Sequence, residues 1–199
     1  MKWLRARSAT ADGLESDTTT ADVMSRARVL DIGTGTGAIA LSVAHETGCT
    51  VIATDLSRDA LSLAFENRAA CGLAERVELR HGATWEPIVP GEVFDVVVSN
   101  PPYIDEADRG TLAPEVVAWE PGAALFAPGA GLAVLSAIIE GAPGHLRAGG
   151  LLALEIGASQ GAAVNAAVAA RGSYGAPRVL KDLAGRDRMV LAETLHDNH

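Results

Sequence analysis

Val29-Leu30-Asp31-Ile32-Gly33-Thr34-Gly35-Thr36-Gly37 is the most informative stretch of this chain. Its first four residues form a short apolar run typical of a strand, and residues 38–45 place apolar side chains on one face of a helix. Glycines between a strand and a helix let the backbone turn sharply and approach a ligand closely. The stretch therefore predicts a strand, a loop and a helix, with a ligand at the loop.

Similar pairs of a short apolar run and a helical stretch follow along the chain. This alternation is typical of a mostly parallel sheet covered by helices, and it predicts an α/β fold. The further strands are expected at residues 50–54, 76–80, 94–99, 151–156, 178–180 and 188–191. The helices are expected at residues 38–45, 57–71, 132–146 and 160–171.

The composition is that of one globular domain. The 199 residues are 48% hydrophobic and 21% charged, which favours a single folded core. Residues 1–27 are polar and are expected to form an arm, with the main domain at 28–199. Neither a secretory h-region nor an apolar run of about 18 residues is present, so we expect a cytoplasmic protein without a membrane association.

The charge and the cysteines exclude some functions. A net charge of −9 disfavours a general nucleic-acid coat, although a local basic patch stays compatible with it. Cys49 and Cys71 lack His or Cys neighbours at metal-ligand spacing, so we expect two reduced thiols and no metal.

Asp55 adds a second sign of a cofactor. It ends the second expected strand, 18 residues beyond Gly37, where a carboxylate can accept hydrogen bonds from ribose hydroxyls. A cap for the next helix is the alternative role of Asp55.

Two cofactors compete for this loop, a nicotinamide dinucleotide and S-adenosylmethionine. The loop reads G-x-G-x-G rather than G-x-G-x-x-G, and the carboxylate of Asp31 before it suits an amino group.

Asn100-Pro101-Pro102-Tyr103 follows the fourth expected strand, at the same carboxyl edge as the glycine loop and Asp55. A planar NH2 group needs two acceptors at a fixed angle, which the Asn100 side chain and a carbonyl of the stiff Pro-Pro segment provide. Tyr103 supplies a flat face for stacking. A proline-stiffened turn without a ligand is the alternative.

Residues 27–192 resemble the protein glutamine N5-methyltransferases of translation release factors, which are class I S-adenosylmethionine-dependent methyltransferases. The resemblance rests on the glycine loop, on Val98–Ile104 with the Asn-Pro-Pro-Tyr motif, and on Leu154-Glu155-Ile156-Gly157. It also rests on Glu120-Pro121, Ala124-Leu125 and Lys181-Asp182-Leu183-Ala184-Gly185-Arg186-Asp187-Arg188. The last stretch is the one that points to this family in particular.

The resemblance implies a Rossmann-like, seven-stranded, mostly parallel sheet with helices on both faces and a reversed last strand. It implies S-adenosylmethionine as cofactor, S-adenosylhomocysteine as product and the glutamine of a release factor Gly-Gly-Gln motif as substrate. We separately expect a monomer. The implied cofactor-binding residues are Asp31, Gly33, Thr34, Gly35, Gly37, Asp55, Leu56, Thr84, Trp85 and Asn100. The implied catalytic residues are Asn100, Pro101 and Tyr103, and the substrate-binding ones are Asn100, Pro101, Pro102, Tyr103 and Glu120.

The sequence departs from the family pattern in two places. The family's N-terminal helical domain, which helps to hold the release factor, has no counterpart in residues 1–27. Where the family often has an acidic residue for the adenine amino group, this chain has Thr84, a weaker acceptor, and we expect a reduced cofactor affinity.

Two other functions fit the same residues. A flat adenine amine of RNA or DNA suits the Asn-Pro-Pro-Tyr geometry as well as an amide does, although the charge of −9 weighs against nucleic acid. A degenerate methyltransferase kept as a non-catalytic binding module is the third reading. Arg186 and Arg188 are expected to pair with Asp182 or Asp187 in a hairpin.

Overall fold

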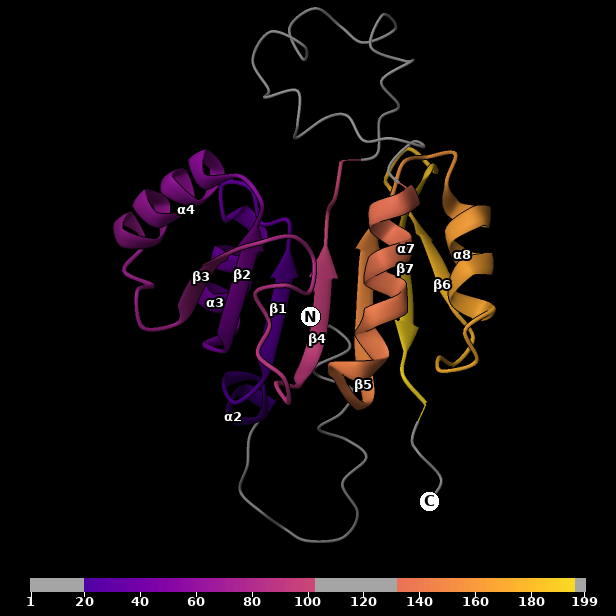
Figure 1. The fold of residues 1–199 in the computed structure, drawn as a ribbon, viewed down its shortest axis with the longest axis horizontal. Coiled ribbons are helices and arrows are strands. Elements are labelled where there is room, and N and C mark those ends of the chain that lie inside the picture. Colours follow the sequence, from indigo (N-terminus) through magenta and orange to yellow (C-terminus); the bar gives the residue numbers. More distant parts are fainter. Residues whose placement is uncertain (1–19, 103–131, 196–199) are drawn as a thin grey trace, which may run out of the picture.

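A single seven-stranded sheet organises the chain, in the order β3-β2-β1-β4-β5-β7-β6. The computed structural model describes residues 20–102 and 132–195. Neighbouring strands are parallel from β3 to β5, whereas β7 runs antiparallel to both β5 and β6 (Figure 1). The strands are β1 (Arg28–Ile32), β2 (Thr50–Asp55), β3 (Val77–His81), β4 (Phe94–Ser99), β5 (Leu146–Glu155), β6 (Arg178–Lys181) and β7 (Asp187–Glu193).

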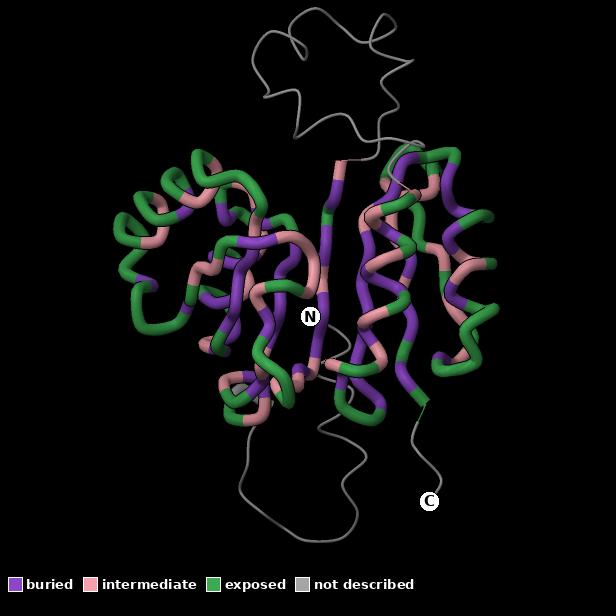
Figure 2. Tube along the Cα trace, in the orientation of Figure 1, coloured by how far each residue is buried: buried purple, intermediate pink, exposed green. Residues whose placement is uncertain are grey.

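Alternating side chains of the central strands build a core on each face of the sheet. Leu30 and Ile52 pack in one core with residues of α7 and α8, while Val29 and Val51 pack in the other with residues of α3. The central strands are buried along most of their length, and α4 is largely exposed (Figure 2). The helices are α2 (Thr20–Ser25), α3 (Ala38–Thr47), α4 (Arg58–Ala70), α7 (Leu132–Gly141), η2 (Ala142–Gly144) and α8 (Gly161–Ala169).

The order of the strands creates a switch point at β1. The chain proceeds from β1 through α3 to β2 on one side, and β4 lies against the other side of β1. In open sheets of this kind, ligands bind beyond the carboxyl ends of the strands at the switch point. The ends of β2, β1 and β4 are therefore the place where a site is expected.

The helix expected at 132–146 is shorter than predicted, and the strand expected at 151–156 is longer. α7 ends at Gly141, and β5 begins at Leu146, which pairs with Phe94 of β4. Pro143 lacks an N–H and cannot continue an α-helix, which accounts for the change to η2. Leu146 and Leu151 pair with β4 on either side of a register shift, whereas the N–H of Gly149 and the carbonyl of Gly150 bond the backbone of Thr194.

Part of the segment expected to be a polar arm belongs to the fold. Residues 20–25 form α2, and Met24 and Ala27 are buried in the core that contains Val29. The boundary near residue 28 stays a prediction. Within 20–102 and 132–195, none of the helices has the length and apolar character needed to cross a bilayer.

Candidate active site

The glycine loop leaves β1 with its backbone bound to β2. The N–H groups of Gly33 and Thr34 both donate to the carbonyl of Thr54, at 2.8 and 2.9 Å. Gly33 and Gly35 have φ values of 73° and 57°, in the left-handed region that favours glycine. Among the residues that the structure describes, chain neighbours aside, no heavy atom lies within 4 Å of the Cβ that either residue would carry, which leaves space for a ligand over the loop.

Asp31 lies under this loop and is completely buried. Its Oδ2 accepts hydrogen bonds from the Thr34 hydroxyl at 2.7 Å and from the Ala40 N–H at 3.2 Å. Its Oδ1 is buried and has no hydrogen-bond partner within residues 20–102 and 132–195. Burial raises the pKa of Asp31 to about 6, against the two hydrogen bonds that lower it. A buried carboxylate oxygen that accepts no hydrogen bond is suited to a hydrogen-bond donor or a cation from a ligand.

Asp55 links the glycine loop to the start of α4. One carboxylate oxygen accepts from the N–H of Gly35 at 2.8 Å, and the other accepts from the N–H of Ser57 at 2.8 Å. Ser57 in turn caps α4 by accepting from Ala60 N. The capping alternative thus belongs mainly to Ser57, and Asp55 lies at the loop where a cofactor role is predicted.

Asn100 follows β4 next to the beginning of the glycine loop, because Ser99 of β4 pairs with Ile32 of β1. The buried Ser99 hydroxyl donates to the Ile32 carbonyl at 2.7 Å and ties the two strand ends together. Asn100 is exposed, whereas Pro101 is buried and Pro102 half-buried. The adjacent ends of β2, β1 and β4 thus bring together Asp55, the loop and Asn100; Tyr103 and Glu120 lie outside the described residues.

Leu56 and His81 form the outer side of this edge. Leu56 is 67% exposed. Its carbonyl lies 3.0 Å from Nε2 of His81, which ends β3, and the Gly82 N–H donates to the Asp55 carbonyl at 3.0 Å. These contacts hold the end of β3 against the residues around Asp55. Sequence reasoning missed them, because a lone histidine at a strand end gives no signal of its partner.

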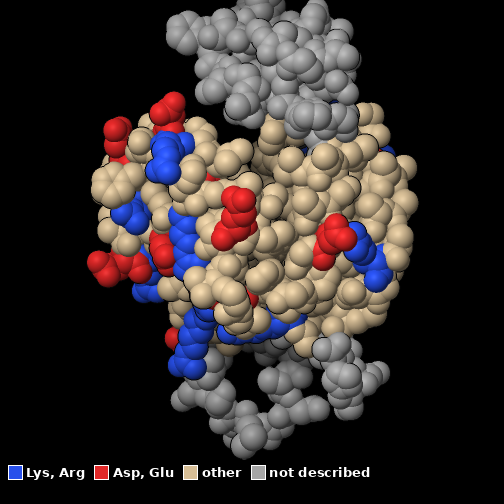
Figure 3. All heavy atoms as spheres, in the orientation of Figure 1, with Lys and Arg blue, Asp and Glu red and all other residues tan. Residues whose placement is uncertain are grey.

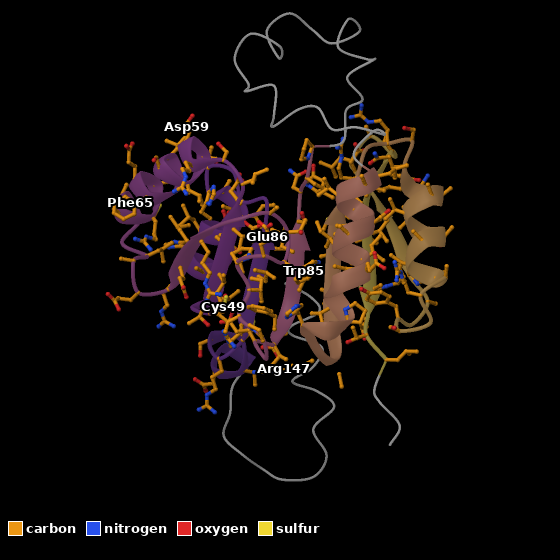
Figure 4. The ribbon with its side chains drawn as sticks, in the orientation of Figure 1. Cys49, Asp59, Phe65, Trp85, Glu86 and Arg147 are labelled. Carbon is orange, nitrogen blue, oxygen red and sulfur yellow. The ribbon has the colours of Figure 1, made fainter. Side chains whose placement is uncertain are left out.

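The segment between β3 and β4, residues 82–93, carries the last two predicted cofactor residues. Thr84 has a φ of 41°, which is rare for a β-branched residue. The Trp85 indole is directed to α7: Nε1 donates to the Ala137 carbonyl at 2.9 Å, and the ring stacks on His145 with centroids 4.8 Å apart (Figure 4). The indole thus anchors the segment to α7 and is only half-buried, and the cofactor contact of Trp85 stays a prediction.

The fold and the switch-point loop define a methyltransferase of class I architecture, as predicted. Consistent with this, the structure is similar to that of the T. thermophilus 16S rRNA N2 G1207 methyltransferase RsmC, solved with AdoMet and guanosine, with a TM-score of 0.62. The two chains are 19% identical over a match that covers 93% of this chain and 45% of RsmC. At that identity the likeness concerns the fold alone.

The chain belongs to the methyltransferase small domain family, whose model matches residues 16–124. It is 53% identical over 167 residues to the release factor glutamine methyltransferase of Cereibacter sphaeroides, and 46% identical over 166 residues to that of Gloeobacter violaceus. Each match covers 83% of this chain. The chain spans only 59% and 58% of the two relatives' own lengths.

Proposed function

We propose that this chain is the catalytic domain of an S-adenosylmethionine-dependent N-methyltransferase that methylates the side-chain amide of a release factor glutamine. The observation that carries the proposal is the meeting of the buried Asp31 oxygen, Asp55 and Asn100 at three adjacent strand ends. The relatives that carry the name release factor glutamine methyltransferase support the choice of acceptor. The monomeric state and the cytoplasmic location stay predictions.

The residues at the glycine loop fit the proposed cofactor. The unpartnered Oδ1 of Asp31 offers an acceptor to a cationic amino group, and the Asp55 carboxylate offers acceptors to ribose hydroxyls. The open space over Gly33 and Gly35 admits a ligand close to the backbone. Leu56 and Thr84 would border the adenine, with Thr84 as a neutral acceptor. When bound, S-adenosylmethionine supplies an electrophilic methyl group on a sulfonium centre.

Asn100 has the central role at the acceptor. Its side-chain oxygen and a carbonyl of Pro101–Pro102 would each accept one hydrogen of the substrate amide NH2 group. An amide nitrogen is a poor nucleophile because its lone pair is delocalised, and two acceptors raise its electron density as positive charge develops. Holding the amide nitrogen in line with the methyl group supplies much of the remaining rate enhancement, so no protein nucleophile is required. The buried Ser99, bonded to Ile32, keeps Asn100 in line with the loop.

The charges of the described surface favour a protein acceptor over a nucleic acid. Basic and acidic side chains are interspersed on the face drawn in Figure 3. Arg28 and Arg80 both pair with Glu92, and Arg171 pairs with Glu140. Arginines paired in this way are less available to phosphates, which agrees with the net charge of −9.

A labelled-methyl assay tests the proposal. Purified protein with S-adenosylmethionine is offered a release factor, total RNA or no acceptor, and we expect label on a glutamine of the release factor. Label in RNA would replace the proposed acceptor with a nucleobase. Failure of both methyl transfer and cofactor binding would leave a non-catalytic binding module.

Asn100→Ala tests the assignment within the site. We expect kcat to fall about 100-fold or more, by analogy with the loss of one transition-state hydrogen bond, while the cofactor Kd changes less than about threefold. Asn165→Ala on α8 is the matched control, because the Asn165 side chain donates to the Pro177 carbonyl, away from the ends of β1, β2 and β4. Methyl transfer by Asn100→Ala at the wild-type rate would defeat the assignment.

A further inference from the structure

The turn between β6 and β7 is built around one carboxylate. Asp182 accepts hydrogen bonds from the N–H groups of Ala184 and Arg186, at 2.8 and 3.0 Å, and from Arg186 Nε at 3.1 Å. These bonds, with the Arg186 N–H foremost, lower the pKa of Asp182. The pairing of Arg186 and Arg188 with Asp182 confirms the prediction for this hairpin. The turn therefore has a fixed shape.

The other charges of the same stretch face neighbouring elements. Arg188 pairs with Glu155 at 3.7 Å, and Lys181 lies 3.9 Å from Asp187. The Asp187 carboxylate lies against Gly161 at the start of α8, so a Cβ at Gly161 would require the Asp187 side chain to move. Leu183 is the exception, because it is fully exposed at the tip. What this rigid turn presents to solvent is an apolar side chain.

The turn lies at the same edge of the sheet as Asn100. Glu155 at the end of β5 pairs with Met189 near the start of β7, and Ser99 pairs with Leu154. The turn before β7 therefore projects beyond the carboxyl ends of β4 and β5. β7 and β6 are the second and third strands from β4, so Leu183 stands roughly 10 to 14 Å across the sheet from Asn100 at about 4.8 Å per strand.

We propose that Leu183 is a docking contact for the protein methyl acceptor, touching an apolar residue three to four positions from the glutamine held at Asn100. The separation follows from roughly 3.3 Å per residue of extended peptide. The inference rests on the proposed function and extends it to a second contact point. A protein segment fits better than a nucleic acid, because the tip is apolar and the cations beside it are paired with Asp182, Asp187 and Glu155.

Leu183→Ser and Leu195→Ser form a matched pair for the test. Leu195 is also exposed, at 53%, but follows β7 at the opposite edge of the sheet. With a full-length release factor as acceptor, we expect Leu183→Ser to raise KM about tenfold, the value of burying one leucine, with kcat and cofactor Kd unchanged. Leu183→Met keeps the apolar contact and should restore KM.

Three results would overturn different parts of the proposal. If both serine variants have the wild-type KM while wild-type protein methylates the release factor, the docking contact is wrong and the proposed function stands. If Leu195→Ser raises KM as much as Leu183→Ser, the effect is not local to the turn and the docking contact is again wrong. If wild-type protein binds S-adenosylmethionine but leaves the release factor unlabelled, the proposed function itself fails.

Discussion

Two loops at the carboxyl edge of the sheet are held in different ways. The glycine loop, residues 33–37, is fixed by short contacts with β2: Gly33 and Thr34 bond Thr54, and Gly35 bonds Asp55. The segment 82–93 is fixed by its side chains: Trp85 bonds Ala137 of α7, and Glu92 pairs with Arg28 of β1 and with Arg80 of the preceding strand β3. The two arginines lower the pKa of Glu92 to about 2.

The difference separates the two proposed halves of the cofactor site. The glycine loop depends on backbone conformation that few residues other than glycine adopt, and so it tolerates little change of its own sequence. The segment 82–93 depends on side chains whose partners lie on α7, β1 and β3 and at His145 between η2 and β5, so it should respond to changes far from the cofactor. Substitutions in each loop can separate these two kinds of support.

Trp85→Ala should have the largest effect on stability. It removes the stacking on His145, the bond to Ala137 and packing against the core that contains Phe94, and we expect a loss of about 3 kcal/mol in the free energy of unfolding. Urea unfolding measures the loss of stability, and calorimetry measures the effect on cofactor binding. Trp85→Phe keeps a ring and should lose roughly 1 kcal/mol. A loss below about 1 kcal/mol for Trp85→Ala would show that the segment has other support.

The glycine loop was more predictable than the segment 82–93, for a physical reason. A strand, three spaced glycines and a helix are neighbours in sequence, and Asp55 ends the adjacent strand, so local pattern and sheet topology suffice. Trp85 meets Ala137 and His145 more than 50 residues away, and no periodicity encodes such a pair.

The fold shows the same division. The expected positions of β1, β2 and β4 agree with the structure because their apolar runs are buried on both faces. The start of β5 at Leu146 was missed, because its pairing with Phe94 is a tertiary contact across two glycines. The roles of the individual site residues remain predictions, which the proposed substitutions test.

Asp31→Asn tests the buried carboxylate of the glycine loop. A pKa raised from 3.8 to about 6 means that the folded state holds the proton more tightly than the unfolded state. Stability from this group is therefore complete below pH 4 and is lost as the pH rises towards 6, by roughly 2 to 3 kcal/mol. Asn carries no charge, so Asp31→Asn should gain stability over wild type at pH 7.5 and lose that advantage at pH 4. Thermal unfolding of both proteins between pH 4 and pH 7.5 measures this difference in stability. A difference that does not change with pH would contradict the raised pKa of Asp31.

Gly35→Ala tests the backbone of the same loop. Because a Cβ at this position meets no atom, the cost is conformational, and we expect a loss of about 1 kcal/mol of stability from a φ of 57°. Gly144→Ala is the control: its Cβ also meets no atom, and its φ lies outside the left-handed region. Equal effects of the two substitutions on chemical unfolding would remove the backbone argument.

Thr84→Asn should have the smallest effect, with the opposite sign. Asn tolerates positive φ better than a β-branched residue, so at φ 41° we expect a gain of roughly 0.5 kcal/mol. Thr50→Asn, at the exposed first residue of β2, is the control and should instead lose a few tenths of a kcal/mol, roughly the loss of strand propensity.

At position 84, Asn also keeps a hydrogen-bond acceptor, whereas Thr84→Ala removes it and should weaken cofactor binding several-fold in calorimetry. An unchanged cofactor Kd for Thr84→Ala would exclude Thr84 from the adenine and leave its strained backbone as the sole peculiarity of that position.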